Sequence, residues 1–131
     1  DTLFASSHQF PHYPGTGAAS ETGVGNVFNA PLAAGAGGTE FRDAMERTIL
    51  PALRAFRPEF VFVSAGFDAH ARDPLASLRL EEPDFEWATL KLKEIAGEFA
   101  NGRLVSTLEG GYDLEALGNS AQAHVDALMA A

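Results

Sequence analysis

The chain has 131 residues, of which 46% are hydrophobic and 21% are charged, and it contains no cysteine. This composition excludes a disordered, collagen-like or coiled-coil protein, and the length predicts a single domain over residues 1–131. A metal ion would have to be held by histidine, carboxylate or backbone oxygen, because no thiolate is available. The net charge of -9 disfavours a nucleic-acid-binding protein and suits a cationic partner.

Four apolar, β-prone segments predict strands. They span residues 2–7, 26–32, 60–65 and 103–108. Continuous apolar runs are typical of strands that are buried on both faces, as in parallel sheets covered by helices.

Three segments with apolar residues at helical spacing lie between and after these strands. The first follows Thr39, a candidate N-cap, and contains Pro51, which we expect to kink the helix. The second begins near Pro83 and ends at the Asn-Gly pair 101–102, and the third begins at Asp113 as N-cap. The order β-β-α-β-α-β-α predicts an open, largely parallel α/β sheet.

No apolar segment reaches the roughly 20 residues that a membrane span needs, and the N-terminus lacks the pattern of a signal peptide. We therefore expect a cytoplasmic protein that binds no membrane. The chain begins at Asp1 rather than at methionine, which favours a processed chain or a piece of a longer one.

Functional residues of such sheets gather beyond the carboxyl ends of the strands, and the segments at these places are unusually polar. We expect His8 and Gln9 to follow the first strand, ahead of residues 10–17. Residues 66–70 and 73–75 follow the third strand, and residues 109–112 follow the fourth.

Asp68 is the most informative of these residues, because a carboxylate directly after a buried strand needs a metal ion, a cation or several donors. It is either a metal ligand or the cap of a turn through the amides of Ala69 and His70. Direct ligation by His70 is disfavoured, since residues two apart in a turn rarely converge on one ion.

Tyr112 follows Gly110 and Gly111, which permit unusual backbone angles and close approach by a substrate. Its hydroxyl group could stabilise an oxyanion, and the alternative is a tyrosine packed at a helix N-terminus. Tyr13 is either the wall of a substrate channel or the anchor of a turn.

Several other motifs carry less weight. His8 and His12 are more typical of packed or solvated histidines than of ligands. The segment 14–17 lacks the lysine of a phosphate loop, which disfavours a nucleotide-binding unit, and no Gly-x-Ser-x-Gly elbow predicts a serine hydrolase.

Four strings together resemble the C-terminal half of zinc-dependent histone deacetylases, and most closely the class II-like and bacterial branch that includes acetylpolyamine amidohydrolases. The resemblance extends from Thr2 to about His124. The strings are SSHQFPHYPGTG, NVFNAPL, PEFVFVSAGFDAHARDPLASL and LVSTLEGGYDLEAL.

This resemblance implies an arginase-like three-layer α/β fold with a mainly parallel sheet, of which only the C-terminal part is present. It also implies hydrolysis of acetylated lysine or acetylated polyamine amides with one zinc ion. Asp68 matches an aspartate ligand of that zinc. Tyr112 matches the tyrosine that polarises the acetyl carbonyl and stabilises the oxyanion.

The resemblance assigns weaker roles to other residues. Tyr13 matches an aromatic wall of the acyl-lysine channel, and Gly110 and Gly111 lie where the backbone approaches that channel. Ser6 and Ser7 fall in a segment that supplies oxygens to a structural potassium ion.

The family's Asp-x-His zinc ligands and its pair of adjacent histidines, which includes the general base, have no counterpart in this chain. We therefore expect an incomplete deacetylase that is inactive alone and needs the missing N-terminal half. The alternative is a non-catalytic α/β interaction module that self-associates with a second copy through its exposed sheet edge.

Overall fold

The computed structural model describes residues 1–131 and confirms the predicted order of strands and helices. A π-helical segment, η1, joins α1 and α2, so these three form one continuous helical segment. The elements are β1 (Phe4–Gln9), β2 (Val27–Leu32), α1 (Gly38–Ala44), η1 (Met45–Ile49), α2 (Leu50–Phe56), β3 (Val61–Ala65), α3 (Glu82–Phe99), β4 (Leu104–Leu108) and α4 (Leu114–Met129).

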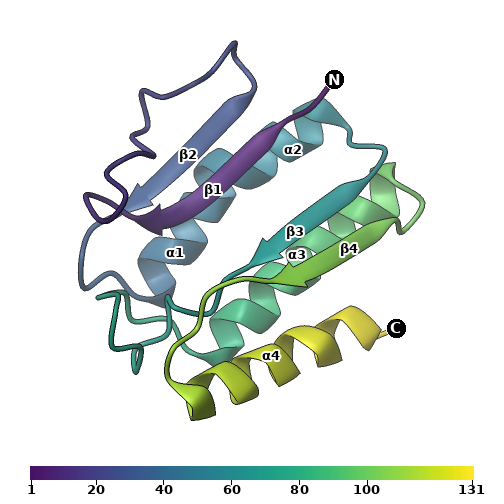
Figure 1. Cartoon of the computed structure of the whole chain (residues 1–131). Helices are drawn as coiled ribbons and strands as arrows, with labels where there is room; N and C mark the ends of the chain where they lie inside the picture. The colour runs from purple at the N-terminus through teal and green to yellow at the C-terminus, as the bar shows by residue number, and fades with distance from the viewer.

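The four strands form two separate parallel pairs. β1 pairs with β2, and β3 pairs with β4, while no hydrogen-bonded ladder joins the two pairs. Figure 1 shows the strands side by side in the order β2, β1, β3, β4, with β1 next to β3. The expected single sheet is therefore interrupted, because the chain has no strand that bridges β1 and β3.

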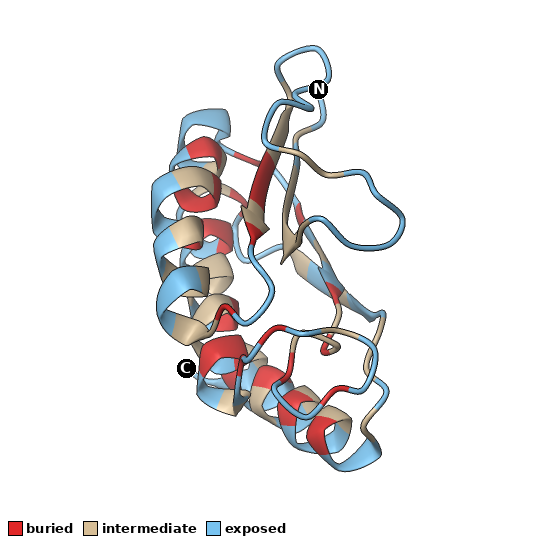
Figure 2. Cartoon of the chain, turned by 90° about the vertical axis from the view of Figure 1, so that its left-hand side faces the viewer, coloured by how far each residue is buried: buried red, intermediate tan, exposed pale blue.

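The helices cover one face of the strands. In β3, Val61 and Ala65 are buried toward the helices, whereas Phe62 and Ser64 on the opposite face are exposed. The buried residues in Figure 2 accordingly concentrate where helices and strands meet. The second helical layer of a three-layer α/β fold is not supplied by this chain.

The first helical segment changes its geometry just before Pro51. A π-helical turn, Met45–Ile49, separates α1 from α2, and Pro51 lies in the first turn of α2. Proline has no N–H group to donate and its ring crowds the carbonyl group four residues earlier, which accounts for the wider turn. The change of helix geometry next to Pro51 agrees with its expected effect, while the kink itself stays a prediction. The prediction of Thr39 as N-cap was wrong. Gly37 is the N-cap, and its N–H group donates to the carboxylate of Glu40 at 3.0 Å.

The ends of the later helices follow the sequence signals. Asn101 and Gly102 have left-handed φ angles of 52° and 74° directly after α3. Asp113 caps α4 by accepting a hydrogen bond from the amide of Ala116 at 2.9 Å. No helix of the chain is both long and apolar enough to cross a membrane.

β1 extends further than predicted. His8 and Gln9 pair in register with Pro31 and Leu32 and so belong to the strand, which corrects the expectation that they follow it. Side chains alternate along a strand, so Ser6 and His8 share one face and Ser7 lies on the other.

Candidate functional site

Asp68 lies just beyond the carboxyl end of β3 and is half-buried. Its carboxylate makes no hydrogen bond within the chain, and the amide of His70 donates instead to the carbonyl of Phe67 at 3.2 Å. The turn-cap interpretation is therefore wrong. A half-buried carboxylate without a donor is free to bind a cation.

The backbones of two glycines enclose this carboxylate. A Cβ atom at Gly110 would lie 2.8 Å from Cγ of Asp68, and one at Gly66 would lie 3.0 Å from its Oδ1. The loop after β4 is fastened there because the carbonyl of Gly110 accepts a hydrogen bond from the amide of Phe67 at 2.8 Å. Residue 110 must be glycine for the two loops to meet around Asp68.

A cavity of about 670 Å³, which we call the site cavity, lies next to Asp68. It is formed by β1, the loop of residues 10–25 and the start of the loop after β3. It brings together most of the residues that the sequence singled out. They are Asp68, Tyr13, Ser6, Ser7, His8 and His12.

One of the two histidines that line this cavity, His8, uses both ring nitrogens in hydrogen bonds within the chain. Nε2 of His8 donates to the carbonyl of Gly17 at 2.8 Å, and Nδ1 therefore accepts from the hydroxyl of Ser6 at 2.9 Å. The hydroxyl of Ser7 is buried and has no partner. Ser6 and Ser7 lie on opposite faces of β1 although both line the site cavity, and their role in binding potassium stays a prediction.

Tyr13 and Tyr112 both expose their rings. The relative exposure is 91% for Tyr13 and 54% for Tyr112, so neither is a packed anchor. Tyr112 does not line the site cavity, but it lies two residues beyond Gly110. Gly111 has a φ of 147°, and a Cβ atom there would lie 2.7 Å from Cδ1 of Leu117, so this position also needs glycine.

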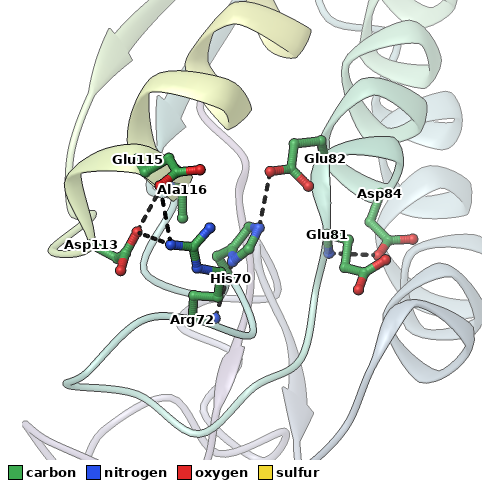
Figure 3. Close-up of polar contacts among 8 residues, drawn as sticks. All are labelled: His70, Arg72, Glu81, Glu82, Asp84, Asp113, Glu115 and Ala116. Carbon is green, nitrogen blue, oxygen red and sulfur yellow. Dashed lines mark hydrogen bonds and ion pairs between the residues drawn. The ribbon is translucent and has the colours of Figure 1, made fainter.

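His70 is fixed away from any role as a ligand. Its Nδ1 accepts from the amide of Arg72 at 3.0 Å, and its Nε2 consequently donates to the carboxylate of Glu82 at 3.2 Å (Figure 3). Hydrogen bonding to the backbone of Glu82 itself is the main cause that holds the pKa of Glu82 below its ordinary value. The hydrogen bond from His70 lowers this pKa further. Both ring nitrogens are used within the fold.

Asp73 has a role that its place in the polar segment after β3 does not predict. It is buried, and its carboxylate accepts hydrogen bonds from the amides of Leu75, Ala76 and Tyr112 at 2.8, 3.2 and 3.0 Å. An aspartate before proline is a turn signal, which could have indicated the first two bonds. The bond to Tyr112 joins segments 39 residues apart and has no local signal.

Residues 1–131 alone do not provide enough ligands for a zinc ion. No group of three histidine, cysteine, aspartate or glutamate side chains could hold a metal ion. Asp68 offers one carboxylate, whereas a catalytic zinc site uses about three protein ligands. The further ligands would have to come from outside residues 1–131.

The site thus consists of an unpaired carboxylate beyond a parallel strand, enclosed by glycine backbone and open to a cavity, on an α/β scaffold. Residues 1–128 match the family model described as the histone deacetylase domain. The chain belongs to the histone deacetylase family, as its sequence motifs predicted.

The curated relatives of the chain include plant and bacterial proteins. It is 44% identical over 124 residues to "Histone deacetylase 10, chloroplastic" of Oryza sativa subsp. japonica, covering 92% of this chain and 28% of the relative. It is 42% identical over 119 residues to the "Histone deacetylase-like amidohydrolase" of Pseudomonas aeruginosa, covering 86% of this chain and 31% of the relative. The chain thus spans about 30% of the length of these relatives.

Solved structures confirm the fold class. The crystal structure of the HDA15 HD domain superposes with a TM-score of 0.85 at 34% identity, over 96% of this chain and 37% of that one. The histone deacetylase Clr3 gives a TM-score of 0.84 at 32% identity, over 96% of this chain and 22% of that one. The chain is therefore a small part of the α/β deacetylase fold.

Proposed function

We propose that residues 1–131 form the C-terminal part of a zinc-dependent deacetylase domain that hydrolyses the amide of acetylated lysine or an acetylated polyamine. One observation carries this proposal. In a chain of the histone deacetylase family, Asp68 presents an unpaired carboxylate beside a cavity that Tyr13 also lines. Zinc, when bound, would supply a Lewis acid for the amide carbonyl.

The chain's own residues have separate roles in this proposal. Asp68 contributes one ligand to the metal site, and Gly110 leaves the space that this carboxylate occupies. Tyr13, exposed at the rim of the site cavity, flanks the acyl chain of the substrate. The hydroxyl of Tyr112 donates a hydrogen bond to the carbonyl oxygen as negative charge develops on it, and the backbone of Gly111 lies beside the acyl chain.

The substrate class agrees with the charge of the chain. Eighteen acidic residues stand against nine basic ones, which favours approach of a cationic peptide or polyamine. A cytoplasmic location stays a prediction, since the name of the rice relative places that protein in the chloroplast.

The space between β1 and β3 could hold the segment that carries the further metal ligands. A cavity of about 530 Å³ runs between these strands and is lined mostly by hydrophobic residues, among them Ala5 of β1 and Val63 of β3. The facing edges of β1 and β3 have no strand partner, and the buried hydroxyl of Ser7 in this cavity has no hydrogen bond. We propose that a strand from the N-terminal half fills this space and ends beside Asp68.

The test uses the full-length protein that contains this chain, with zinc content and acetyl-lysine hydrolysis measured on the same sample. We expect one zinc ion per chain and turnover in the full-length protein, and loss of both in Asp68→Ala. Asp43→Ala, which removes an exposed carboxylate on α1, is the matched control and should keep both. Zinc retained by Asp68→Ala would contradict the proposal.

A second function is favoured by a different observation. β4 also has a free edge, and Phe62 and Val105 expose hydrophobic side chains on the face without helices. A non-catalytic module could pair with a second copy through these surfaces. A stable dimer of the full-length protein that binds no zinc would support this function over hydrolysis.

A further inference from the structure

No hydrogen bond fixes the side chain of Tyr112. The residue is 54% exposed, and its hydroxyl makes no hydrogen bond within the chain. The direction of this side chain therefore depends on what holds residues 110–113. Gly111 sets the backbone on one side with its φ of 147°, and Asp113 begins α4 on the other.

Asp73 provides the only side-chain hydrogen bond to the backbone of Tyr112. Oδ2 of Asp73 accepts from the amide of Tyr112 at 3.0 Å, while Oδ1 accepts from Leu75 at 2.8 Å and Ala76 at 3.2 Å. The carboxylate is thus fixed to its own loop by one oxygen and to the loop after β4 by the other. Asp73 is only 8% exposed, so water does not readily replace these bonds.

Arg72 joins the same two loops from the surface. Its guanidinium group lies 3.4 Å from the carboxylate of Glu115 and 3.7 Å from that of Asp113 (Figure 3). The hydrogen bond to Glu115, followed by attraction to Asp113, raises the pKa of Arg72 above its ordinary value. The side chain of Arg72 is 52% exposed, so solvent screens these ion pairs and they contribute little to holding the loops together. The buried carboxylate of Asp73 is therefore the stronger link.

We infer that Asp73 is a positioning residue, which acts through the backbone of Tyr112 to place its hydroxyl over the reacting carbonyl. The inference rests on the proposed function, because it needs Tyr112 to be the oxyanion donor. A shift of about 1 Å in a catalytic group can cost about 100-fold in rate, so one lost backbone bond is enough to matter. Asp73 itself does not line the site cavity.

The kinetic test is a double-mutant cycle in the full-length protein with its metal bound. Asp73→Asn keeps the volume of the side chain but replaces one acceptor oxygen with an amide donor. We expect kcat to fall about 10- to 100-fold with KM nearly unchanged. The same substitution in a Tyr112→Phe background should lower kcat no further, because the hydroxyl that it positions is already gone. Asp43→Asn, the same chemical change on the surface of α1, is the control and should leave kcat unchanged.

A second readout measures the backbone directly. Hydrogen exchange of residues 109–115, followed by mass spectrometry, should accelerate in Asp73→Asn and stay at the wild-type rate in Asp43→Asn. An equal loss of kcat with and without the Tyr112 hydroxyl would overturn the inference, as would unchanged exchange together with unchanged kcat. Wild-type kcat in Tyr112→Phe alone would instead overturn the proposed role of Tyr112, and this inference with it.

Discussion

The backbone of Gly110 lies against the carboxylate of Asp68, so closely that a Cβ atom at position 110 would be 2.8 Å from Cγ of Asp68. The contact joins the loops after β3 and β4. It leaves the carboxylate without a hydrogen-bond donor and facing the site cavity.

Gly110→Ala should therefore weaken metal binding. The new methyl group must displace the carboxylate of Asp68 or the loop that carries it, since 2.8 Å is well inside van der Waals contact. We expect the zinc affinity of the full-length protein to fall at least about tenfold, the order of loss seen when support for a metal ligand is removed. Competition with a chromophoric chelator measures this affinity.

A matched control is available within α4. Gly118 has open space where a Cβ atom would be added, so Gly118→Ala should keep the zinc affinity and raise the free energy of unfolding by up to about 1 kcal/mol. Unchanged zinc affinity in Gly110→Ala would show that Asp68 is not a ligand or that the two loops separate easily.

The local features of the fold could be predicted from the sequence because their signals lie within a few residues. The N-cap Asp113 and the helix end at Asn101 and Gly102 are confirmed for this reason. Thr39 was wrong as N-cap because Gly37 and Glu40 satisfy the first turn with a backbone-to-carboxylate bond instead. The N-cap propensities of threonine and glycine alone do not distinguish a helix that starts after Thr39 from one that starts after Gly37.

The non-local features could not be predicted. The split between the strand pairs depends on which strand neighbours β1 and β3, and the chain does not contain a strand between them. Asp73 and Tyr112 are brought together only when the loops after β3 and β4 meet. For Asp68, the position beyond the strand could be predicted from the sequence, whereas the lack of a donor depends on Gly66 and Gly110.

Stability should decrease in mild acid because of His124. The hydroxyl of Ser106 donates to Nε2 of His124 at 2.8 Å, since Nδ1 donates to Thr89 at 2.7 Å and Thr89 donates onward to the carbonyl of Phe85. These bonds hold the neutral ring, and burial lowers the pKa of His124 below 6.5. The unfolded chain thus binds a proton at a pH where the folded chain does not.

The free energy of unfolding should consequently be highest above a pH of about 6.5 and fall as the pH drops through 6.5 toward the lower pKa of the folded state. Urea unfolding at a series of pH values between about 5 and 8 measures it. His124→Gln should remove this part of the pH dependence, and the exposed His12→Gln should retain it. An identical pH profile in His124→Gln would contradict the assignment.

The helical layer should depend strongly on Ile95. This side chain of α3 is fully buried in the cluster that also contains Met45 and Val61. Ile95→Ala should lower the free energy of unfolding by about 2 to 5 kcal/mol, the range for large-to-small changes in a core. Leu90→Ala, on the same helix at 37% exposure, should cost no more than about 1 kcal/mol. Equal losses in urea titrations of the two variants would mean that α3 packs differently.

The face without helices should cause self-association of the 131-residue chain. Phe62 is 66% exposed there and lies beside Val105 in the register of β3 and β4. Burial of apolar surface stabilises an association by about 25 cal/mol per Å². Replacing Phe62 removes about 100 Å² or more of aromatic surface from each contact, so each contact loses a few kcal/mol. Phe62→Ser should therefore shift sedimentation equilibrium toward monomer without lowering stability.

Leu114→Ser tests whether any exposed hydrophobic residue would have this effect. Leu114 is 83% exposed at the start of α4, outside the face that Phe62 occupies, so its replacement should leave the association constant unchanged. In the full-length protein, the proposed N-terminal half would cover Phe62, and Phe62→Ser should instead lower the stability of the domain. Association that persists in Phe62→Ser would assign self-pairing to the free edges of β1, β3 or β4, since backbone groups there need no particular side chain.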